Sequence, residues 1–234
     1  HYSAILGTDD LRVFERLLGI YLDMGFVDLK VKLMGDLARD REKASLLKSR
    51  LQSGVSIRFD ANNCWPDAGM ASDYLGSLDC PYWAVEEPLS PGDYPQLADL
   101  ARNLDTKIIL DESLLRLQQL AQLQPANDHW LVNLRVSKMG GLLRSLEMVD
   151  ACRELGIPVI IGAQVGETSL LTRAALTIAG SARDILVAQE GAFGTYLLEH
   201  DICEPCLMFG RHGRLDSGQL SVQNSSGSGL AITI

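Results

Sequence analysis

The chain has 234 residues, of which 47% are hydrophobic and 22% are charged, as expected for one globular domain with a sizeable core. Its formal net charge of −9 argues against nucleic acids and anionic membrane surfaces as partners. No apolar run reaches the roughly 18 residues of a membrane-spanning helix, and the scattered cysteines favour a reducing compartment, so we expect a cytoplasmic protein.

Short apolar runs alternate with amphipathic stretches along the chain, in units of about 25 residues that are typical of βα repeats. The predicted strands are Tyr2–Leu6, Val27–Leu33, Val55–Phe59, Tyr82–Val85, Lys107–Leu110, Trp130–Val136, Ile157–Ile161 and Ile185–Ala188. Apolar residues at helical spacing predict helices over Asp9–Met24, Asp36–Gln52 and Gly140–Leu155.

Eight such repeats favour a closed (β/α)-barrel over residues 1–209. A doubly wound open sheet is the alternative, but it often carries a glycine-rich phosphate fingerprint after its first strand, and this sequence has none there. Residues 210–234 are rich in Gly and Ser, and we expect an extended segment that packs on the barrel or frays.

Two lysines, Lys30 and Lys32, lie in the second predicted strand. Strand alternation places both side chains on one face, which in a barrel is the interior. Inward lysines are costly unless carboxylates or a ligand compensate their charge, so the pair indicates a polar site. From this segment alone, an exposed edge strand with two solvated lysines is an equal alternative.

The third, fourth and fifth predicted strands each end in a carboxylate, at Asp60, Glu86 and Asp111. A single acidic residue at such a point is often only a helix N-cap. Three of them on neighbouring strands, about 5 Å apart, converge at one rim and repel each other unless a cation intervenes. Mg²⁺ prefers oxygen ligands of this kind, so the sequence predicts a magnesium site, with Mn²⁺ as the other candidate.

The sixth predicted strand carries polar residues at Asn133, Arg135 and Ser137, which share one face if the strand stays regular. Lys138 then points to the opposite face. Lysines on the second strand would therefore face a cation on the sixth strand across a carboxylate-bound metal. This layout suits proton abstraction next to a carboxylate, with the metal stabilising the enolate as it forms.

Five motifs, in order along the chain, resemble the enolase superfamily and in particular its muconate lactonizing enzyme-like branch. They are Lys30-Val31-Lys32, Asp60-Ala61-Asn62, Glu86-Glu87-Pro88, Asp111-Glu112-Ser113 and Lys138-Met139-Gly140-Gly141. The resemblance implies a (β/α)-barrel of the enolase C-terminal type. It also implies that Asp60, Glu86 and Asp111 bind Mg²⁺ in this chain.

The same resemblance implies that Lys32 is the general base and that Lys30 supports it, the pattern known for this superfamily. Glu167 matches a position of the seventh strand that contacts substrate or the opposite base. We expect Asn62, Asn133 and Lys138 to contact the substrate as well.

The sequence departs from the family pattern at Arg135, where the branch carries a second catalytic lysine. Arginine keeps its proton at neutral pH and is a poor general base, so a two-base racemase or epimerase reaction is disfavoured. One-base reactions, such as cycloisomerisation and dehydration of the o-succinylbenzoate synthase type, fit this residue better, and epimerisation stays an open alternative. In either one-base reaction we expect Arg135 to serve as a fixed cation beside the enolate.

Members of the family carry an N-terminal α+β capping domain, whereas this chain begins at the first barrel strand. We expect the capping domain to be missing or to be supplied by a separate chain. The expected function is a Mg²⁺-dependent isomerase or lyase that acts on a small-molecule carboxylate in a homo-oligomer. The alternative is a catalytically degenerate member that acts as a metal-stabilised binding or scaffold protein.

Overall fold

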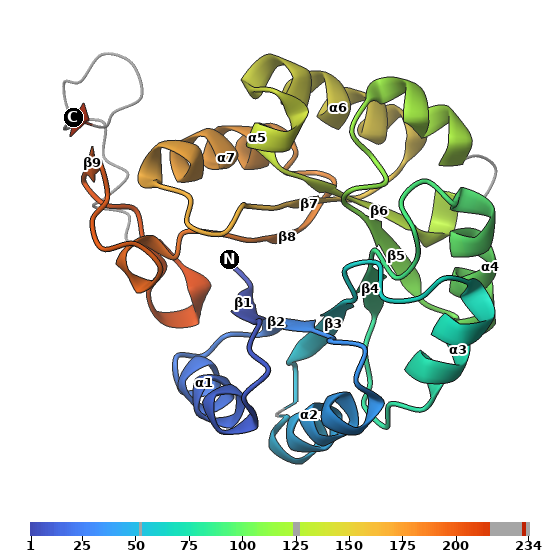
Figure 1. Cartoon of the computed structure of the whole chain (residues 1–234). Coiled ribbons are helices and arrows are strands. Elements are labelled where there is room, and N and C mark those ends of the chain that lie inside the picture. Colours follow the sequence, from blue (N-terminus) through green and yellow to red (C-terminus); the bar gives the residue numbers. More distant parts are fainter. Residues whose placement is uncertain (52, 124–126, 216–230, 233–234) are drawn as a thin grey trace.

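The computed structural model describes residues 1–51, 53–123, 127–215 and 231–232. Its central feature is a curled sheet of eight parallel strands in the order β1 to β8, with helices around the outside (Figure 1). The strands are β1 (Ala4–Leu6), β2 (Asp28–Lys32), β3 (Ser56–Asp60), β4 (Ala84–Glu86), β5 (Lys107–Leu110), β6 (Trp130–Leu134), β7 (Val159–Ile161) and β8 (Leu186–Gln189). All eight predicted strands are confirmed, with bounds that shift by at most two residues.

Most strands are followed by an α-helix that returns the chain to the start of the next strand. The α-helices are α1 (Leu11–Asp23), α2 (Leu37–Arg50), α3 (Ala68–Gly76), α4 (Tyr94–Leu104), α5 (Val136–Met139), α6 (Leu142–Leu155) and α7 (Ser169–Ser181). The fifth unit is different, because the segment after β5 forms the 3₁₀ helix η1 (Leu117–Leu123). No helix in the described ranges is long and apolar enough to cross a membrane.

The three predicted helices are confirmed, and local chemistry explains where they begin. The side chain of Asp10 accepts hydrogen bonds from the first-turn amides of α1, and Asp36 does the same for α2. Helix α6 begins only after Gly140 and Gly141, whose φ angles of 85° and 114° no helix tolerates.

The curled sheet brings its first and last strands together. Tyr2 and Gln189 form a parallel bridge, and the amide of Ser3 donates to the carbonyl of Gln189 at 2.7 Å. Because every strand pairs with its sequence neighbour, the order excludes the doubly wound alternative. Among the described residues, the contact between β1 and β8 is limited to this short stretch next to the named strands.

The sixth strand ends earlier than predicted, at Leu134. Arg135 then becomes the N-cap of α5, and the amide of Met139 donates to its carbonyl at 3.0 Å. The prediction that Asn133, Arg135 and Ser137 share a strand face is therefore wrong. The orientation inferred for Lys138 from a regular strand fails for the same reason, since a helical turn advances side chains by about 100° rather than 180°.

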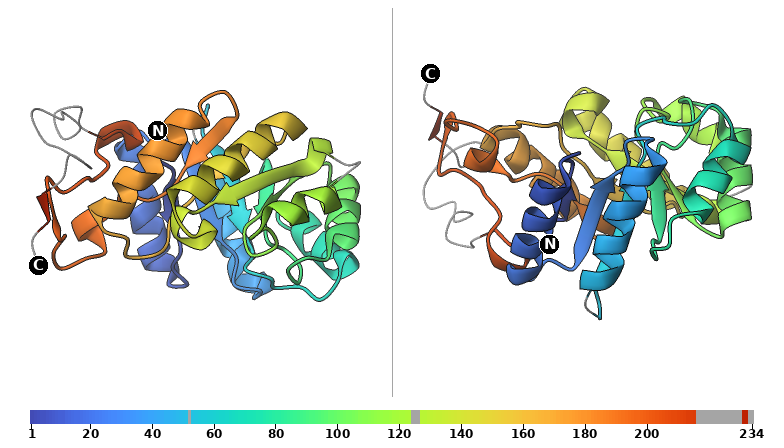
Figure 2. Two further views of the ribbon diagram at one scale, coloured as in Figure 1. Left: turned by 90° about the horizontal axis from the view of Figure 1, so that it is seen from above. Right: turned by 60° about the horizontal axis from the view of Figure 1, so that its bottom comes forward.

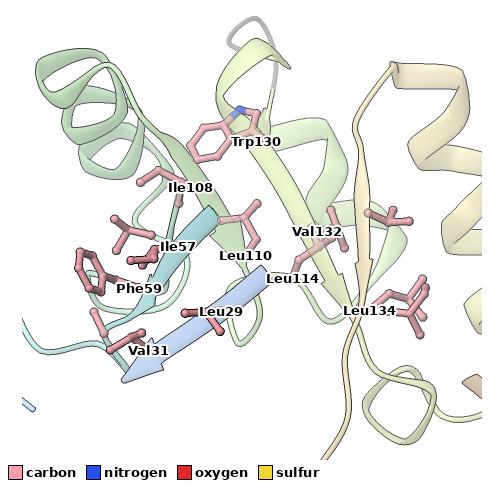
Figure 3. Close-up of a cluster of buried hydrophobic side chains, with 14 of the residues drawn as sticks. Leu29, Val31, Ile57, Phe59, Ile108, Leu110, Leu114, Trp130, Val132 and Leu134 are labelled. Carbon is pink, nitrogen blue, oxygen red and sulfur yellow. The ribbon is translucent and has the colours of Figure 1, made fainter. Parts of the chain in front are cut away.

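Strand alternation divides the buried side chains into two sets. Outward residues such as Leu29, Val31 and Val132 pack with the helices in the main apolar core, part of which is drawn in Figure 3. A smaller apolar cluster lies on the inner face of the sheet and comprises Ala84, Ile109, Leu131, Ile160 and Ala188. The rest of the inner face carries charged side chains, which is where the candidate site lies.

Glu87 fixes the loop that carries Asp111. It directly follows β4, has a positive φ of 40°, and turns its fully buried carboxylate under the β5 loop. One carboxylate oxygen accepts from the amides of Asp111 at 2.6 Å and Ser113 at 2.7 Å, and the other accepts from the Ser113 hydroxyl at 2.8 Å. Burial raises the pKa of Glu87 to about 7, although the hydrogen bonds from Ser113 oppose the rise.

The segment after the eighth strand contacts the start of the chain. Strand β9 (Cys203–Glu204) pairs with β10 (Ala231–Ile232) to one side of the curled sheet (Figure 2). Gly213 accepts a hydrogen bond from the amide of Tyr2 at 2.7 Å, and the His212 amide donates to Met24 at 2.7 Å. The predicted division at residue 210 stays a prediction, since most of 210–234 lies outside the described residues.

The outer core predicts a position-dependent loss of stability along α1. Leu18 is 1% exposed, whereas Ile20 on the same helix is 46% exposed. We expect Leu18→Ala to lower the free energy of unfolding by about 2–5 kcal/mol, because a buried cavity is left. Ile20→Ala should cost about 0.5 kcal/mol. Urea unfolding of both variants measures the difference, and equal losses would contradict the packing of α1.

Glu87 predicts a pH dependence of stability. Its carboxyl group holds a proton more readily in the folded chain, with a pKa of about 7, than at the ordinary value of 4.5. The folded state therefore binds more protons between these values, and its contribution to stability is lost as pH rises from 4.5 to 7. We expect Glu87→Gln to remove up to about 3 kcal/mol of that decline. Urea unfolding at pH 5 and pH 7.5 tests it, and parallel profiles for both proteins would refute the assignment.

Candidate active site

Lys30 lies at the centre of the inner face, where its side chain is almost completely enclosed. Its ammonium nitrogen is 3.1 Å from Asp60, 2.8 Å from Glu86 and 3.2 Å from Glu190. Burial alone lowers the pKa of Lys30, but the three carboxylates together raise it above the ordinary value. Lys30 therefore stays protonated, and its ammonium group joins the carboxylates at the ends of three strands.

Arg58 and Glu190 complete this network, and sequence reasoning missed both as site residues. Arg58 is fully buried in β3 and donates to Glu190 at 2.9 Å, to Ser3 at 3.0 Å and to Asp28. Burial would raise the pKa of Glu190, but Lys30 and Arg58 hold it well below its usual range. Two signals in the sequence were available: Arg58 lies two residues before Asp60, and Glu190 lies two after Ala188, on the inner face.

Glu86 is at the end of β4, paired in register with Asp60. One of its oxygens, Oε1, accepts from Lys30 at 2.8 Å and from Asn133 at 2.9 Å, while Oε2 makes an ion pair with Lys30 at 2.8 Å. Burial raises the pKa of Glu86, and Lys30 opposes the rise. Gly162 lies against Asn133, whose Oδ1 would be 1.9 Å from an added Cβ, so any larger residue at position 162 would displace the Asn133 side chain.

Asp111 follows β5 and contacts two cations. Arg135 donates to Oδ2, and Lys138 donates to Oδ1 at 2.6 Å. Lys138 also donates to the main-chain carbonyls of Asp111 and Asn133, at 2.7 Å each. Burial, and then the charge of Arg135, lower the pKa of Lys138 to about 7. Lys138 therefore points into the site, contrary to the orientation expected from a regular strand.

The remaining predicted residues lie around the rim. Lys32 is half-buried next to Gly7 and pairs in register with Asp60, and its amine has no partner among the described residues. Asn62 is exposed, and its main-chain amide donates to the carboxylate of Asp60 at 3.3 Å. Glu167 lies in the loop after β7 and not on the strand itself. In this loop its carboxylate accepts a hydrogen bond from the main-chain amide of Gln164 at 2.8 Å. Burial raises the pKa of Glu167.

The three carboxylates predicted to bind metal occupy neighbouring strand ends, but they are paired with side-chain cations. Over residues 1–51, 53–123 and 127–215, no group of three His, Cys, Asp or Glu side chains could hold a metal ion as it stands. The three carboxylates that converge most closely enclose the ammonium group of Lys30 instead. The donor set itself fits a hard cation, since all its atoms are carboxylate oxygens at neighbouring strand ends. A metal ion would have to compete with the contacts that Lys30, Arg135 and Lys138 now make.

Comparisons with known proteins place this arrangement in a family. The family model described as "Enolase C-terminal domain-like" matches residues 14–234. An N-succinylamino acid racemase from an Amycolatopsis species is 30% identical over 86% of this chain and 54% of its own length. The o-succinylbenzoate synthase of Bacillus subtilis is 24% identical over 98% of this chain and 59% of its own.

Solved structures agree on the fold. A dipeptide epimerase from Enterococcus faecalis V583, complexed with Mg and the dipeptide L-Leu-L-Tyr, has a TM-score of 0.85 at 22% identity. That match covers 98% of this chain and 63% of the epimerase chain. This chain thus spans little more than half the length of the curated relatives described above. The sequence motifs, the curled eight-stranded sheet and the family match agree: the chain belongs to the enolase C-terminal domain-like family of the enolase superfamily.

Proposed function

We propose that this chain is the barrel part of a Mg²⁺-dependent isomerase or lyase that removes the α-proton of a carboxylate substrate. The observation that supports this most strongly is the row of carboxylates at the ends of β3, β4 and β5. Lys32 lies in register beside Asp60, and its side-chain nitrogen has no partner among the described residues. Its relatives include racemases, epimerases, a cycloisomerase and a synthase.

In this mechanism Asp60, Glu86 and Asp111 would hold the metal, which would supply positive charge next to the substrate carboxylate. Lys32 accepts the α-proton at its Nζ atom, which is available because it has no partner in the described part of the chain. Lys30 cannot share this role, because three carboxylates hold its ammonium group charged and enclosed. Its charge instead keeps the carboxylates of β3 and β4 in place.

Arg135 makes a one-base reaction the better proposal. It occupies the position of the second lysine of the branch, but its guanidinium group keeps its proton and already contacts Asp111. A guanidinium group on that side of the site stabilises negative charge without returning a proton to the opposite face. Cycloisomerisation and dehydration need only one base, so we propose one of these rather than epimerisation or racemisation.

An additional domain or partner is proposed to cover the site. Large apolar side chains are exposed in the segments after β2, β5, β6 and β7, all on the carboxyl side of the sheet. They are Met34 at 46%, Leu115 at 46%, Leu143 at 77% and Val165 at 87% exposure. Apolar side chains grouped at a rim in this way mark an interaction surface. A capping domain, which would also exclude water and contact the substrate, is the proposed occupant.

A second candidate function is a non-catalytic scaffold. The pairing of Asp111 with Arg135 and Lys138 favours it, because side-chain cations already neutralise that carboxylate without a metal. The cytoplasmic location and the homo-oligomer stay predictions under either function.

Magnesium binding is the first test. We expect isothermal titration to show Mg²⁺ binding to the wild-type chain and at least about tenfold weaker binding to Asp60→Asn, because one charged ligand is lost. Asp79→Asn is the matched control, since the Asp79 side chain is 88% exposed and away from the site. Equal affinities of wild type and Asp60→Asn would remove Asp60 from the metal site.

Proton exchange tests the base. In D₂O with Mg²⁺, we expect the α-proton of at least one carboxylate substrate to exchange in a screen of dipeptides, N-succinylamino acids and succinylbenzoate precursors, as NMR would show. Lys32→Ala should slow exchange by about 100-fold or more, because the general base is removed. Lys48→Ala, at an exposed lysine, should exchange at the wild-type rate. Undiminished exchange in Lys32→Ala would assign the base elsewhere, and no exchange in wild type with bound Mg²⁺ would favour the scaffold.

A further inference from the structure

The guanidinium group of Arg135 lies between two of the carboxylates assigned to the metal. Its Nη2 atom contacts Asp111 Oδ2 and is 3.8 Å from Glu86 Oε1. Both carboxylates are almost completely buried, and the Arg135 side chain is 15% exposed. A single side-chain nitrogen therefore occupies the gap that a cation bridging Glu86 and Asp111 would fill.

Few contacts fix the side chain of Arg135 in this position. Apart from its contacts with the two carboxylates, it donates through Nη1 to Gln164 Oε1 at 3.1 Å, and Gln164 is exposed. Its Nε atom is buried with no hydrogen-bond partner in the described parts of the chain. An unsatisfied buried donor costs free energy, so the inward position of Arg135 is maintained mainly by the charge of the carboxylates.

Lys138 provides a contrast on the same carboxylate. It is also a basic side chain on Asp111, but it approaches the other oxygen, Oδ1, and is anchored by the carbonyls of Asp111 and Asn133. It makes no ion pair with Glu86 among the described residues. The two cations on Asp111 therefore differ in position, since only Arg135 lies in the gap between two proposed ligands.

We propose that Arg135 is an intramolecular competitor of the metal: its guanidinium group occupies the space between Asp111 and Glu86, and a divalent cation binds only when Arg135 leaves it. This inference rests on the proposed function, which assigns those carboxylates to Mg²⁺. Two cations cannot share the gap, because like charges this close repel strongly in a buried site. Metal affinity is therefore lower than the carboxylates alone would give.

Isothermal titration with MgCl₂ tests the competition on wild type, Arg135→Gln and Lys138→Gln. Each variant removes one basic side chain from Asp111, but only Arg135→Gln empties the gap. We expect Arg135→Gln to bind Mg²⁺ at least about tenfold more tightly than wild type, and to exceed any gain in Lys138→Gln. Equal or weaker binding by Arg135→Gln, or the same gain in both variants, would overturn the competition.

A second measurement uses the wild-type protein and so does not depend on how the variants fold. In ¹⁵N-arginine-labelled protein, the Nε–H resonance of Arg135, identified by its loss in Arg135→Gln, should shift along the Mg²⁺ binding curve. An unchanged resonance at saturating Mg²⁺ would overturn the inference while leaving the proposed metal site intact. If neither wild type nor Arg135→Gln binds Mg²⁺, the proposed function and the inference both fail.

Discussion

The ammonium group of Lys30 compensates the negative charge of the carboxylates on the inner face of the sheet. These carboxylates come from β3, β4 and the end of β8 and enclose it. An isolated ion there would be strongly disfavoured, and removing one member of such a buried set costs about 3–5 kcal/mol because its partners are left uncompensated. Arg58 extends the same compensation through Glu190 to the amino end of β2. The positions of Asp60 and Glu86 are consequences of this balance.

Much of the fold followed from patterns that are local in sequence. Apolar runs of strand length, each followed by a helical pattern, predict the eight parallel strands. Strands of a parallel sheet are buried on both faces, so their sequences are almost continuously apolar and can be recognised locally. The alternation in β2 likewise predicted that Lys30 faces inward, since the side-chain period of a strand is fixed by geometry. The row of acidic strand ends was visible for the same reason.

The parts of the site that were missed depend on long-range pairing. The contact between Arg58 and Glu190 joins residues 132 positions apart, and no local pattern indicates which cation inside a barrel meets which carboxylate. The orientation of Lys138 depends on where β6 ends. Its sequence stays apolar at alternate positions through Val136, so periodicity alone could not reveal that the chain turns at Arg135.

The hydrogen bond between Tyr2 and Gly213 has a consequence for solubility. Among the described residues, strand β1 pairs with β8 through the short bridge at Tyr2. Gly213 lies so close to it that an added Cβ would be 2.4 Å from the Tyr2 carbonyl oxygen. The late segment therefore covers backbone groups at the seam of the sheet that would otherwise be open. Unpaired strand edges recruit strands from other molecules, so this close contact protects the seam against edge-to-edge aggregation.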